Sequence, residues 1–258
     1  MPGPPTRREE RLLRSLALRK HRDDAGLFLA EGIRAVEDLL ASPLRVRLAV
    51  ASSSLGDDPR GATLQQVVEA KGLPLRVTGD RELRLLAGTE HPQGILAVAE
   101  LPRHRLADLS VAGEPAVLLL LDAVQDPGNL GTLVRTAEAL GALAVLPLPG
   151  SVDAWNPKAV RAAMGSSFRL PVIPCTWEEA APWLREHGFT TVAAVVGSEP
   201  LPSPPPRRVA LVLGNEGAGV GAETLAHADL RAGVALRGRA ESLNVAAAGA
   251  LLLHELLR

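Results

Sequence analysis

The chain has 258 residues, 47% of them apolar, and a formal net charge of −1. This length suits one large domain or two ordinary ones with a sizeable core, and the near-zero charge excludes a polycation that binds nucleic acid over its whole surface. With three Phe, three Trp and no Tyr, the composition argues against aromatic platforms that stack on bases.

The few cysteine and histidine residues limit which disulfides and metal sites the chain can form. Cys175 is the only cysteine, so neither an internal disulfide nor a cysteine cluster for zinc can form, and a reducing compartment is expected. The six His residues show no metal-ligand spacing, so we expect no metal. The first ten residues lack the apolar segment of a signal peptide, and long apolar stretches are broken by Gly, Pro or charge. We therefore expect a cytoplasmic protein without membrane contact.

The N-terminal segment 1–22 is basic. Its two acidic residues are outnumbered by seven cationic ones, which are Arg7, Arg8, Arg11, Arg14, Arg19, Lys20 and Arg22. Leucines among them give a partly helical apolar pattern. On charge alone, two interpretations are equally supported: a solvated surface helix or an arm that contacts RNA phosphates.

The first part of the chain predicts a compact α/β unit. Short apolar runs predict strands at 28–30, 46–51, 75–77 and 94–100. Helical periodicity predicts helices at 32–40, 64–70 and 81–87, the last with Asp80 as its N-cap. The polar, Pro-bearing stretch that follows is typical of a linker. We expect a substrate-binding domain at 1–105, a linker at 106–115 and a second domain at 116–258.

The second domain alternates strands and helices, which predicts a mostly parallel sheet with helices on both faces. The almost wholly apolar run 116–121 is typical of a strand buried on both faces. The other expected strands are 143–146, 191–196, 209–213 and 230–236, and the expected helices are 130–140, 156–164, 177–187 and 242–257.

A glycine-rich loop, Gly214-Asn-Glu-Gly-Ala-Gly219, follows one of these strands. Such a loop lets backbone N–H groups approach a ligand closely. It is not a P-loop because no Gly-Lys pair is present, and its glycine spacing, G-x-x-G-x-G, differs from the dinucleotide-binding G-x-G-x-x-G. Alone, this loop indicates only a tight turn.

Two further stretches carry polar residues. Ser242 is a good N-cap for the last helix, with Asn244 in its first turn. That helix is apolar almost all round, so its N-terminus should face inward and point donors into a polar cavity. Upstream, Asn129 and Arg135 lie six residues apart at the start of another helix. Separately, capping, turn formation and a surface arginine explain these residues.

Together, three ordered motifs resemble the SpoU/TrmH family of RNA 2′-O-ribose methyltransferases, within the knotted SPOUT class. They are Asn129-Leu-Gly-Thr-Leu-Val-Arg-Thr-Ala137, Leu211-Val-Leu-Gly-Asn-Glu-Gly217 and Glu241-Ser-Leu-Asn-Val245. The first domain adds Phe28-Leu-Ala-Glu-Gly-Ile-Arg-Ala-Val-Glu37 and His91-Pro-Gln-Gly-Ile-Leu-Ala97, which are similar to the substrate-binding domain of many members. This resemblance favours the phosphate-contacting interpretation of the basic segment.

The resemblance implies S-adenosylmethionine as methyl donor, a C-terminal trefoil knot and a homodimer. It implies backbone contacts to the donor at Gly214, Val234 and Leu243, in a pocket that also includes Asn215 and Leu236. The family usually has Pro-Met where this chain has Ala235-Leu236, so the pocket wall differs here.

The resemblance also implies that Arg135 is the catalytic centre, contacting the RNA phosphate and helping the 2′-hydroxyl lose its proton. Because arginine stays protonated in proteins, stabilising the developing alkoxide is the role that its chemistry favours over accepting a proton. Asn129, Glu216, Ser242 and Asn244 match positions that orient the arginine or the ribose.

The expected function is methylation of a ribose 2′-hydroxyl, in ribosomal RNA by analogy with the first domain. A tRNA 2′-O-methyltransferase and a non-catalytic RNA-binding protein on the same fold remain alternatives. A nicotinamide enzyme is disfavoured by the glycine spacing.

Overall fold

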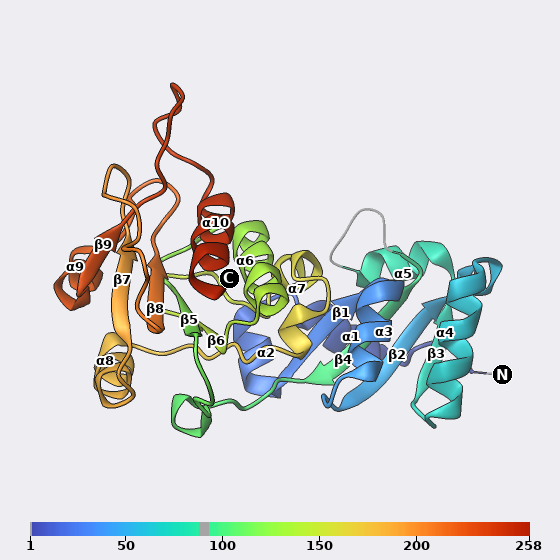
Figure 1. Cartoon of the computed structure of the whole chain (residues 1–258). Coiled ribbons are helices and arrows are strands. Elements are labelled where there is room, and N and C mark those ends of the chain that lie inside the picture. Colours follow the sequence, from blue (N-terminus) through green and yellow to red (C-terminus); the bar gives the residue numbers. More distant parts are fainter. Residues whose placement is uncertain (1, 88–92) are drawn as a thin grey trace. The chain divides into compact units, whose positions relative to one another are not determined.

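The computed structural model describes residues 2–87 and 93–258, so His91 and Pro92 of the first-domain motif lie outside the described residues. The chain divides into two compact units, which are described separately. One comprises Met1–Arg103 with Trp155–Phe168, and the other His104–Ala154 with Arg169–Arg258. Each unit is built on one sheet (Figure 1), with strand orders β1-β4-β2-β3 and β6-β5-β8-β7-β9.

The first unit is a mixed four-stranded sheet with helices. Its central strand β4 runs antiparallel to β1 and β2, whereas β2 and β3 are parallel. The elements are α1 (Arg7–Ser15), α2 (Arg19–Ala25), β1 (Leu27–Glu31), α3 (Ile33–Ala41), β2 (Val46–Ser52), η1 (Leu55–Asp57), α4 (Pro59–Ala70), β3 (Leu75–Thr78), α5 (Asp80–Leu86), β4 (Ile95–Glu100), α7 (Pro157–Ala162) and η3 (Ser166–Phe168).

Alternation along β4 separates two cores in this unit. Ile95 and Ala97 face the core formed with α3 and α4, while Leu96 and Val98 face the core formed with α1 and α5. Helix α1 is held by Leu13, which is buried there, and by a capping box between Thr6 and Glu9. Asp80, the predicted N-cap of α5, is instead the first residue of the helix, and Gly79 precedes it at the cap.

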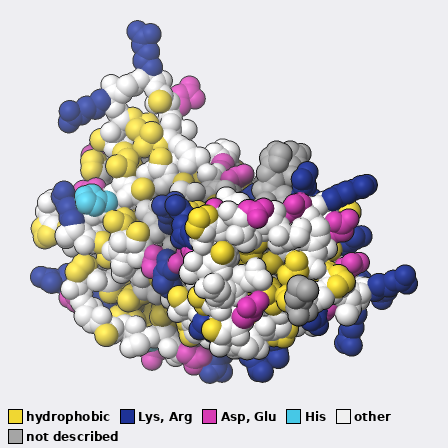
Figure 2. Space-filling model, turned by 90° about the vertical axis from the view of Figure 1, so that its right-hand side faces the viewer, with side chains coloured by type: hydrophobic (Ala, Val, Ile, Leu, Met, Phe, Trp, Pro, Cys, Tyr) yellow, Lys and Arg dark blue, Asp and Glu magenta, His cyan; other side chains and the backbone are white. Residues whose placement is uncertain are grey.

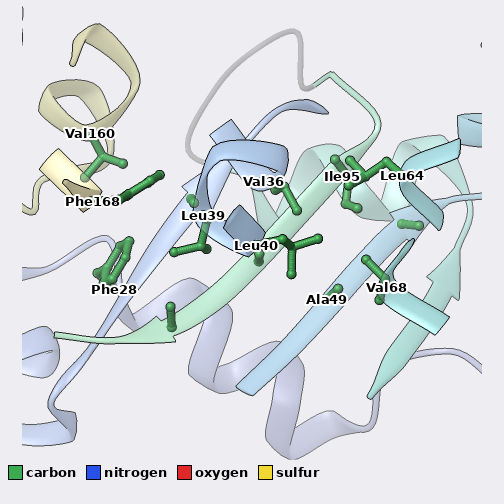
Figure 3. Close-up of a cluster of buried hydrophobic side chains, with 14 of the residues drawn as sticks. Phe28, Val36, Leu39, Leu40, Ala49, Leu64, Val68, Ile95, Val160 and Phe168 are labelled. Carbon is green, nitrogen blue, oxygen red and sulfur yellow. The ribbon is translucent and has the colours of Figure 1, made fainter. Parts of the chain in front are cut away.

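The segment 155–168 packs with the first unit, although the predicted boundaries assign it to the second domain. The ring centroids of Phe28 and Trp155 lie 4.6 Å apart, and those of Phe28 and Phe168 lie 5.7 Å apart. Figure 3 shows Val160 and Phe168 of this segment beside Phe28 of β1. Burial of these side chains against β1 is the physical reason for the difference, because large aromatic contacts outweigh proximity in sequence.

The second unit is a five-stranded sheet in which the neighbouring strands run parallel to one another. Its elements are η2 (Leu106–Asp108), β5 (Ala116–Leu121), α6 (Pro127–Leu140), β6 (Ala144–Pro147), α8 (Trp177–Glu186), β7 (Thr190–Ala194), β8 (Arg208–Leu213), α9 (Ala222–His227), β9 (Leu230–Ala232) and α10 (Val245–Leu257). The predicted α/β class with a parallel sheet is confirmed.

Helices cover both faces of this sheet (Figure 1). Leu118 and Leu120 of β5 pack with α8 on one face, whereas α6 and α10 pack against each other over the other face. The predicted linker also joins the α8 side, because Leu106 is buried in that core. Within the described residues, no helix is long and apolar enough to cross a membrane.

Several predicted elements are shorter than expected, β9 and α10 among them. Strand β9 ends at Ala232 rather than 236, because the backbone of Gly233 turns to bond the carbonyl of Glu199. The last helix begins at Val245 rather than at 242. Helix α9 was not predicted from the sequence.

Gly249 allows α10 to approach the sheet, and its replacement tests this packing. A Cβ there would lie 2.5 Å from Cδ2 of Leu133 and 2.6 Å from Cδ1 of Leu213. We expect Gly249→Val to lower the free energy of unfolding by about 1–3 kcal/mol through overpacking. Chemical denaturation measures this. Ala247→Val, at an exposed position of the same helix, is the matched control, and equal losses in both variants would contradict the packing argument.

Candidate functional site

The glycine-rich loop is a closed turn at the end of β8. The backbones of Asn215 and Gly219 exchange two hydrogen bonds of 2.9 Å. A Cβ on Gly214 would lie 2.2 Å from the backbone carbon of Gly219, so only glycine fits that position. The Asn215 side chain fixes the turn further, because its Oδ1 accepts from Gly217 N at 2.9 Å and its Nδ2 donates to Ala123 O at 2.8 Å.

Glu216, at the tip of this loop, binds the turn that follows β5. Its carboxylate accepts from the backbone N–H of Gln125 at 3.1 Å and of Asp126 at 3.0 Å. It also accepts from Nδ2 of Asn129 at 3.0 Å. Three hydrogen bonds to one carboxylate therefore join the loop to the start of α6. Hydrogen bonds to an ionised acceptor are stronger than those between neutral groups.

The same chain of bonds continues to α10. Oδ1 of Asn129 accepts from Nδ2 of Asn244 at 3.0 Å. Oδ1 of Asn244 in turn accepts from Ala246 N at 2.9 Å, which makes Asn244 the N-cap of α10. The structure thus brings together one residue from each of the three motifs: Glu216, Asn129 and Asn244.

These bonds affect the ionisation of Glu216. Partial burial raises the pKa of this carboxyl, but the hydrogen bonds from Asn129 and from the backbone of Asp126 and Gln125 outweigh it, so that the pKa lies below its ordinary value. The carboxylate is consequently ionised at neutral pH and can hold both partners.

Arg135 lies on α6 apart from this chain of bonds. Six residues of α-helix turn by about 240°, so Arg135 and Asn129 lie on different faces of α6. Arg135 is exposed, and in the part of the chain that the structure describes it makes no hydrogen bond or ion pair. Its guanidinium is accordingly available to an external anion, and its catalytic role stays a prediction.

Ser242 was predicted as the cap of the last helix, and this is wrong. Asn244 occupies the cap, because its side-chain oxygen reaches the free N–H groups of the first turn. Ser242 is exposed and instead lines a cavity beside α10.

That cavity has a volume of about 70 Å³ and is mostly apolar. Its lining combines four predicted residues with others from the end of β7, the turn after it, the residue after β9 and α10: Ala194, Val195, Val196, Gly233, Val234, Leu236, Ser242, Leu243, Ala248 and Leu252. Gly233 permits close approach of the segments that follow β9 and β7, since a Cβ there would lie 2.7 Å from the carbonyl oxygen of Val195. Gly214 and Asn215 do not line it.

The cavity fits part of a nucleoside-containing cofactor. Its volume is below the roughly 300–1,000 Å³ of small-molecule pockets, so it can seat only one portion of such a ligand. Its walls suit that portion, because Leu236 and Leu243 expose apolar side chains at its border. The segment between β9 and α10, which carries both leucines, projects from the sheet in Figure 1.

The predicted RNA-contacting residues lie on α1 and α2 of the first unit. All are exposed except Arg22, and the exposed ones are Arg7, Arg8, Arg11, Arg14, Arg19 and Lys20. Arg22 is only 1% exposed, and its Nη1 donates to the carbonyls of Leu16 and Ala17 at 2.7 and 2.9 Å. Its inclusion among RNA contacts is wrong, because its charge holds the α1–α2 turn.

Basic and acidic side chains are both present on the face of the molecule in Figure 2. On the face in Figure 2, the dark blue Lys and Arg side chains project separately with magenta Asp and Glu among them. Glu9 of the basic segment 1–22 forms an ion pair with an arginine from β3: Nη2 of Arg76 lies 3.1 Å from Oε1 of Glu9. Among the described residues, no group of three His, Cys, Asp or Glu could hold a metal ion.

Comparison with known proteins decides the family. Residues 116–254 match the model of the SpoU rRNA methylase family, and residues 11–97 match the MRM3-like substrate binding domain. The chain belongs to the SpoU rRNA methylase family.

Relatives of this SpoU methylase cover nearly its whole length. It is 37% identical to the 23S rRNA (guanosine(2553)-2′-O)-methyltransferase RlmP of Bacillus subtilis, over 94% of this chain and 93% of the relative. It is 35% identical to the 23S rRNA (guanosine-2′-O-)-methyltransferase RlmB of Coxiella burnetii, over 88% and 94%. The crystal structure of the AdoMet-bound rRNA methyltransferase from Sinorhizobium meliloti superposes with a TM-score of 0.83 at 30% identity, over 96% and 93%.

Sequence reasoning missed the backbone partners of Glu216. The N–H groups of Gln125 and Asp126 leave no side-chain pattern, so the motif could name Glu216 but not what it binds. Asp126 also caps α6 by accepting from Asn129 N at 2.8 Å, and the Asp-Pro pair before a helix is the signal that could have found it.

Acid should loosen this site through Glu216. Its folded-state pKa lies below 4.5, the ordinary value, so the unfolded state binds more protons as the pH falls through and below 4.5. The stability that Glu216 contributes is therefore present above pH 4.5 and lost below it. We expect the unfolding free energy to fall less steeply between pH 5 and about 3 in Glu216→Gln than in the wild type.

Urea denaturation at several pH values measures this slope. Glu223→Gln, which removes an exposed carboxylate on α9, controls for the loss of one charge. If the unfolding free energy depends on pH equally in Glu216→Gln and in the wild type, these hydrogen bonds do not favour the ionised carboxyl.

Proposed function

We propose that this SpoU methylase transfers a methyl group from S-adenosylmethionine to a ribose 2′-hydroxyl of ribosomal RNA. The observation that carries the proposal is the hydrogen-bonded chain from Glu216 through Asn129 to Asn244, which joins the three family motifs at one edge of the parallel sheet. The names of the full-length relatives support the reaction and the class of RNA.

The cavity beside α10 supports the choice of cofactor. S-adenosylmethionine supplies an electrophilic methyl group on a positively charged sulfur. Val234, Leu236 and Leu243 would contact its apolar portion, with Ser242 at the same wall. Gly214 and Asn215 support the site from the adjoining loop, since the closed turn fixes the end of β8.

Arg135 supplies the charge that the RNA side of the reaction needs. The 2′-hydroxyl becomes nucleophilic as it loses its proton, and an arginine that stays protonated stabilises the developing negative oxygen. Because the Arg135 guanidinium makes no bond within the described residues, it is free to bind phosphate or ribose. Asn129, Asn244 and Glu216 position the helix that carries it.

Ribosomal RNA is favoured over tRNA because of the first unit. Its match to a substrate-binding domain accompanies relatives that are named as 23S rRNA enzymes. The proposal includes a homodimer, a trefoil knot at the C-terminal sheet and action in the cytoplasm, all supported by family membership. A non-catalytic RNA-binding protein remains the alternative that the following experiment tests.

Arg135→Ala should abolish most methyl transfer. Loss of one preorganised donor at a developing oxyanion reduces kcat by about 10²–10³-fold. Transfer of labelled methyl groups from S-adenosylmethionine to ribosomal RNA measures this, together with S-adenosylmethionine binding by calorimetry. We expect the binding constant for S-adenosylmethionine to stay unchanged.

Arg185→Ala, at an exposed position of α8, is the matched control and should retain wild-type turnover. Wild-type turnover by a folded Arg135→Ala variant would refute the catalytic role. Absence of both cofactor binding and methyl transfer in the wild type would favour the non-catalytic alternative.

The exposed arginines of α1 should bind RNA phosphates. Replacing Arg7, Arg8, Arg11 and Arg14 with Ala should weaken RNA binding and flatten its dependence on salt, by about 0.7–0.9 in log–log slope for each phosphate that the variant no longer neutralises. Filter binding between 50 and about 200 mM salt measures the slope. An unchanged slope would support the solvated-helix interpretation.

A further inference from the structure

A cavity of about 650 Å³ opens in the first unit, at the end of the sheet where β1 and β2 finish. Its volume is within the range of small-molecule sites. The lining residues come from four chain segments: Glu31, Ile33, Arg34, Ala35, Ser52, Ser54, Leu55, Asp58, Arg60, Gln93, Gly94, Arg161 and Met164. None of them belongs to the site described above.

The charges around this cavity leave cations for a ligand. Arg60 is already bound, since its Nε donates to both carboxylate oxygens of Glu37 at 2.8 and 2.9 Å. The Asp58 carboxylate caps α4 by accepting from Arg60 N and Gly61 N. Arg34 is exposed and forms no ion pair within the described ranges, and Arg161 Nη1 lies 3.8 Å from Glu31 Oε1. Arg161 is thus ion-paired with Glu31, but its side chain remains 48% exposed. Arg34 and the exposed part of the Arg161 guanidinium are therefore the positive groups that can meet an anion.

The remaining walls combine apolar surface with hydrogen-bonding groups. Ile33, Leu55 and Met164 supply the apolar part, and Ser52 and Gln93 supply polar groups. Met164 has a φ of 49°, in the left-handed region that a non-glycine residue rarely adopts. Such backbone strain occurs preferentially at ligand sites. It places a flexible, polarizable side chain at the cavity.

The described residues include no exposed Phe or Trp side chain that could stack on a base. Of the six aromatic residues that the sequence contains, five are buried and Trp183 is half-buried within a stack on His187. A flat ligand in this cavity would instead contact Ile33, Leu55 and Met164. The features of the cavity match the three parts of a nucleotide. Its cations suit the phosphate, its apolar walls suit the face of the base, and its polar groups suit the edge of the base.

We propose that this cavity seats one unpaired nucleotide of the RNA substrate, with its phosphate at Arg34 and Arg161 and its base against Met164. RNA is the ligand because the inference rests on the proposed function, and proteins read RNA sequence chiefly from unpaired bases. Arg161 and Met164 lie in the segment matched by the methylase model, whereas the other lining residues lie in the substrate-binding match. The site is incomplete without α7 and the residues just after it.

Methionine labelling gives a direct test, because the sequence contains only Met1 and Met164. In full-length protein labelled with methyl-¹³C methionine, the Met164 resonance is assigned with Met164→Leu. The probes are the four ribonucleoside monophosphates, short single-stranded oligoribonucleotides and inorganic phosphate. We expect a saturable shift of the Met164 resonance with nucleotides or oligonucleotides, and little with inorganic phosphate.

Two results would overturn the proposal. One is a Met164 resonance that no nucleotide or oligonucleotide moves at millimolar concentration. The other is an equal shift with inorganic phosphate, which would indicate a site for anions without a base pocket.

Kinetics of the full chain give an independent readout. Arg34→Ala and Arg161→Ala should each raise the KM for RNA by roughly tenfold, as expected for loss of a charged hydrogen bond, while kcat at saturating RNA and binding of S-adenosylmethionine stay unchanged. Arg34→Lys should recover part of the loss. Arg81→Ala, an exposed α5 arginine outside the cavity lining, is the control.

Failure of the inference is distinguishable from failure of the proposed function. A wild-type enzyme that methylates RNA, with the KM of Arg34→Ala and Arg161→Ala equal to that of Arg81→Ala, would remove the nucleotide site and leave the methyltransferase intact. A wild type that transfers no methyl group would refute the function itself, whereas the NMR titration would still report on the cavity.

Discussion

The carboxylate of Glu216 accepts hydrogen bonds from residues 125, 126 and 129, and the arrangement of the candidate site depends on it. This contact is possible because β5 and β8 are parallel neighbours, with Leu121 opposite Leu213 at their carboxyl ends. The segments that leave the two strands emerge side by side. Topology brings the loops together, and one ionised side chain then fixes their relative position.

Helix capping extends this constraint into the core. Asn244 uses its oxygen to cap α10 and its amide nitrogen to hold Asn129, while Asp126 caps α6, the helix that carries Asn129. These two helices pack on each other, and Gly249 lets α10 approach Leu133 and Leu213 closely. Each motif residue is therefore attached to an element whose position is set by apolar burial, which limits how far the exposed polar groups can drift.

Periodicity predicted the elements whose residues are buried in a regular pattern, and the strand at 116–121 is confirmed at both ends because all six of its residues are buried. Positions set by tertiary contacts were not predictable. In the sequence Arg22 is part of a basic run, yet its guanidinium donates hydrogen bonds to backbone carbonyls of the preceding turn. Ser242 and Asn244 are both good caps, and only the path of the chain decides for Asn244. The motifs named Glu216 and Asn129 but not their mutual bond.

The segment 155–168 lies within the predicted second domain by sequence but packs in the first unit. It is flanked on both sides by chain that packs in the second unit, yet Trp155 and Phe168 close around Phe28 of the first. Half of the six aromatic residues are used in this one cluster. Burial of these rings ties α7 to β1, and thereby holds Arg161 and Met164 at the cavity whose other walls belong to the substrate-binding unit. Although the composition is poor in aromatic residues, half of them lie in this cluster, where they join segments that are distant in sequence.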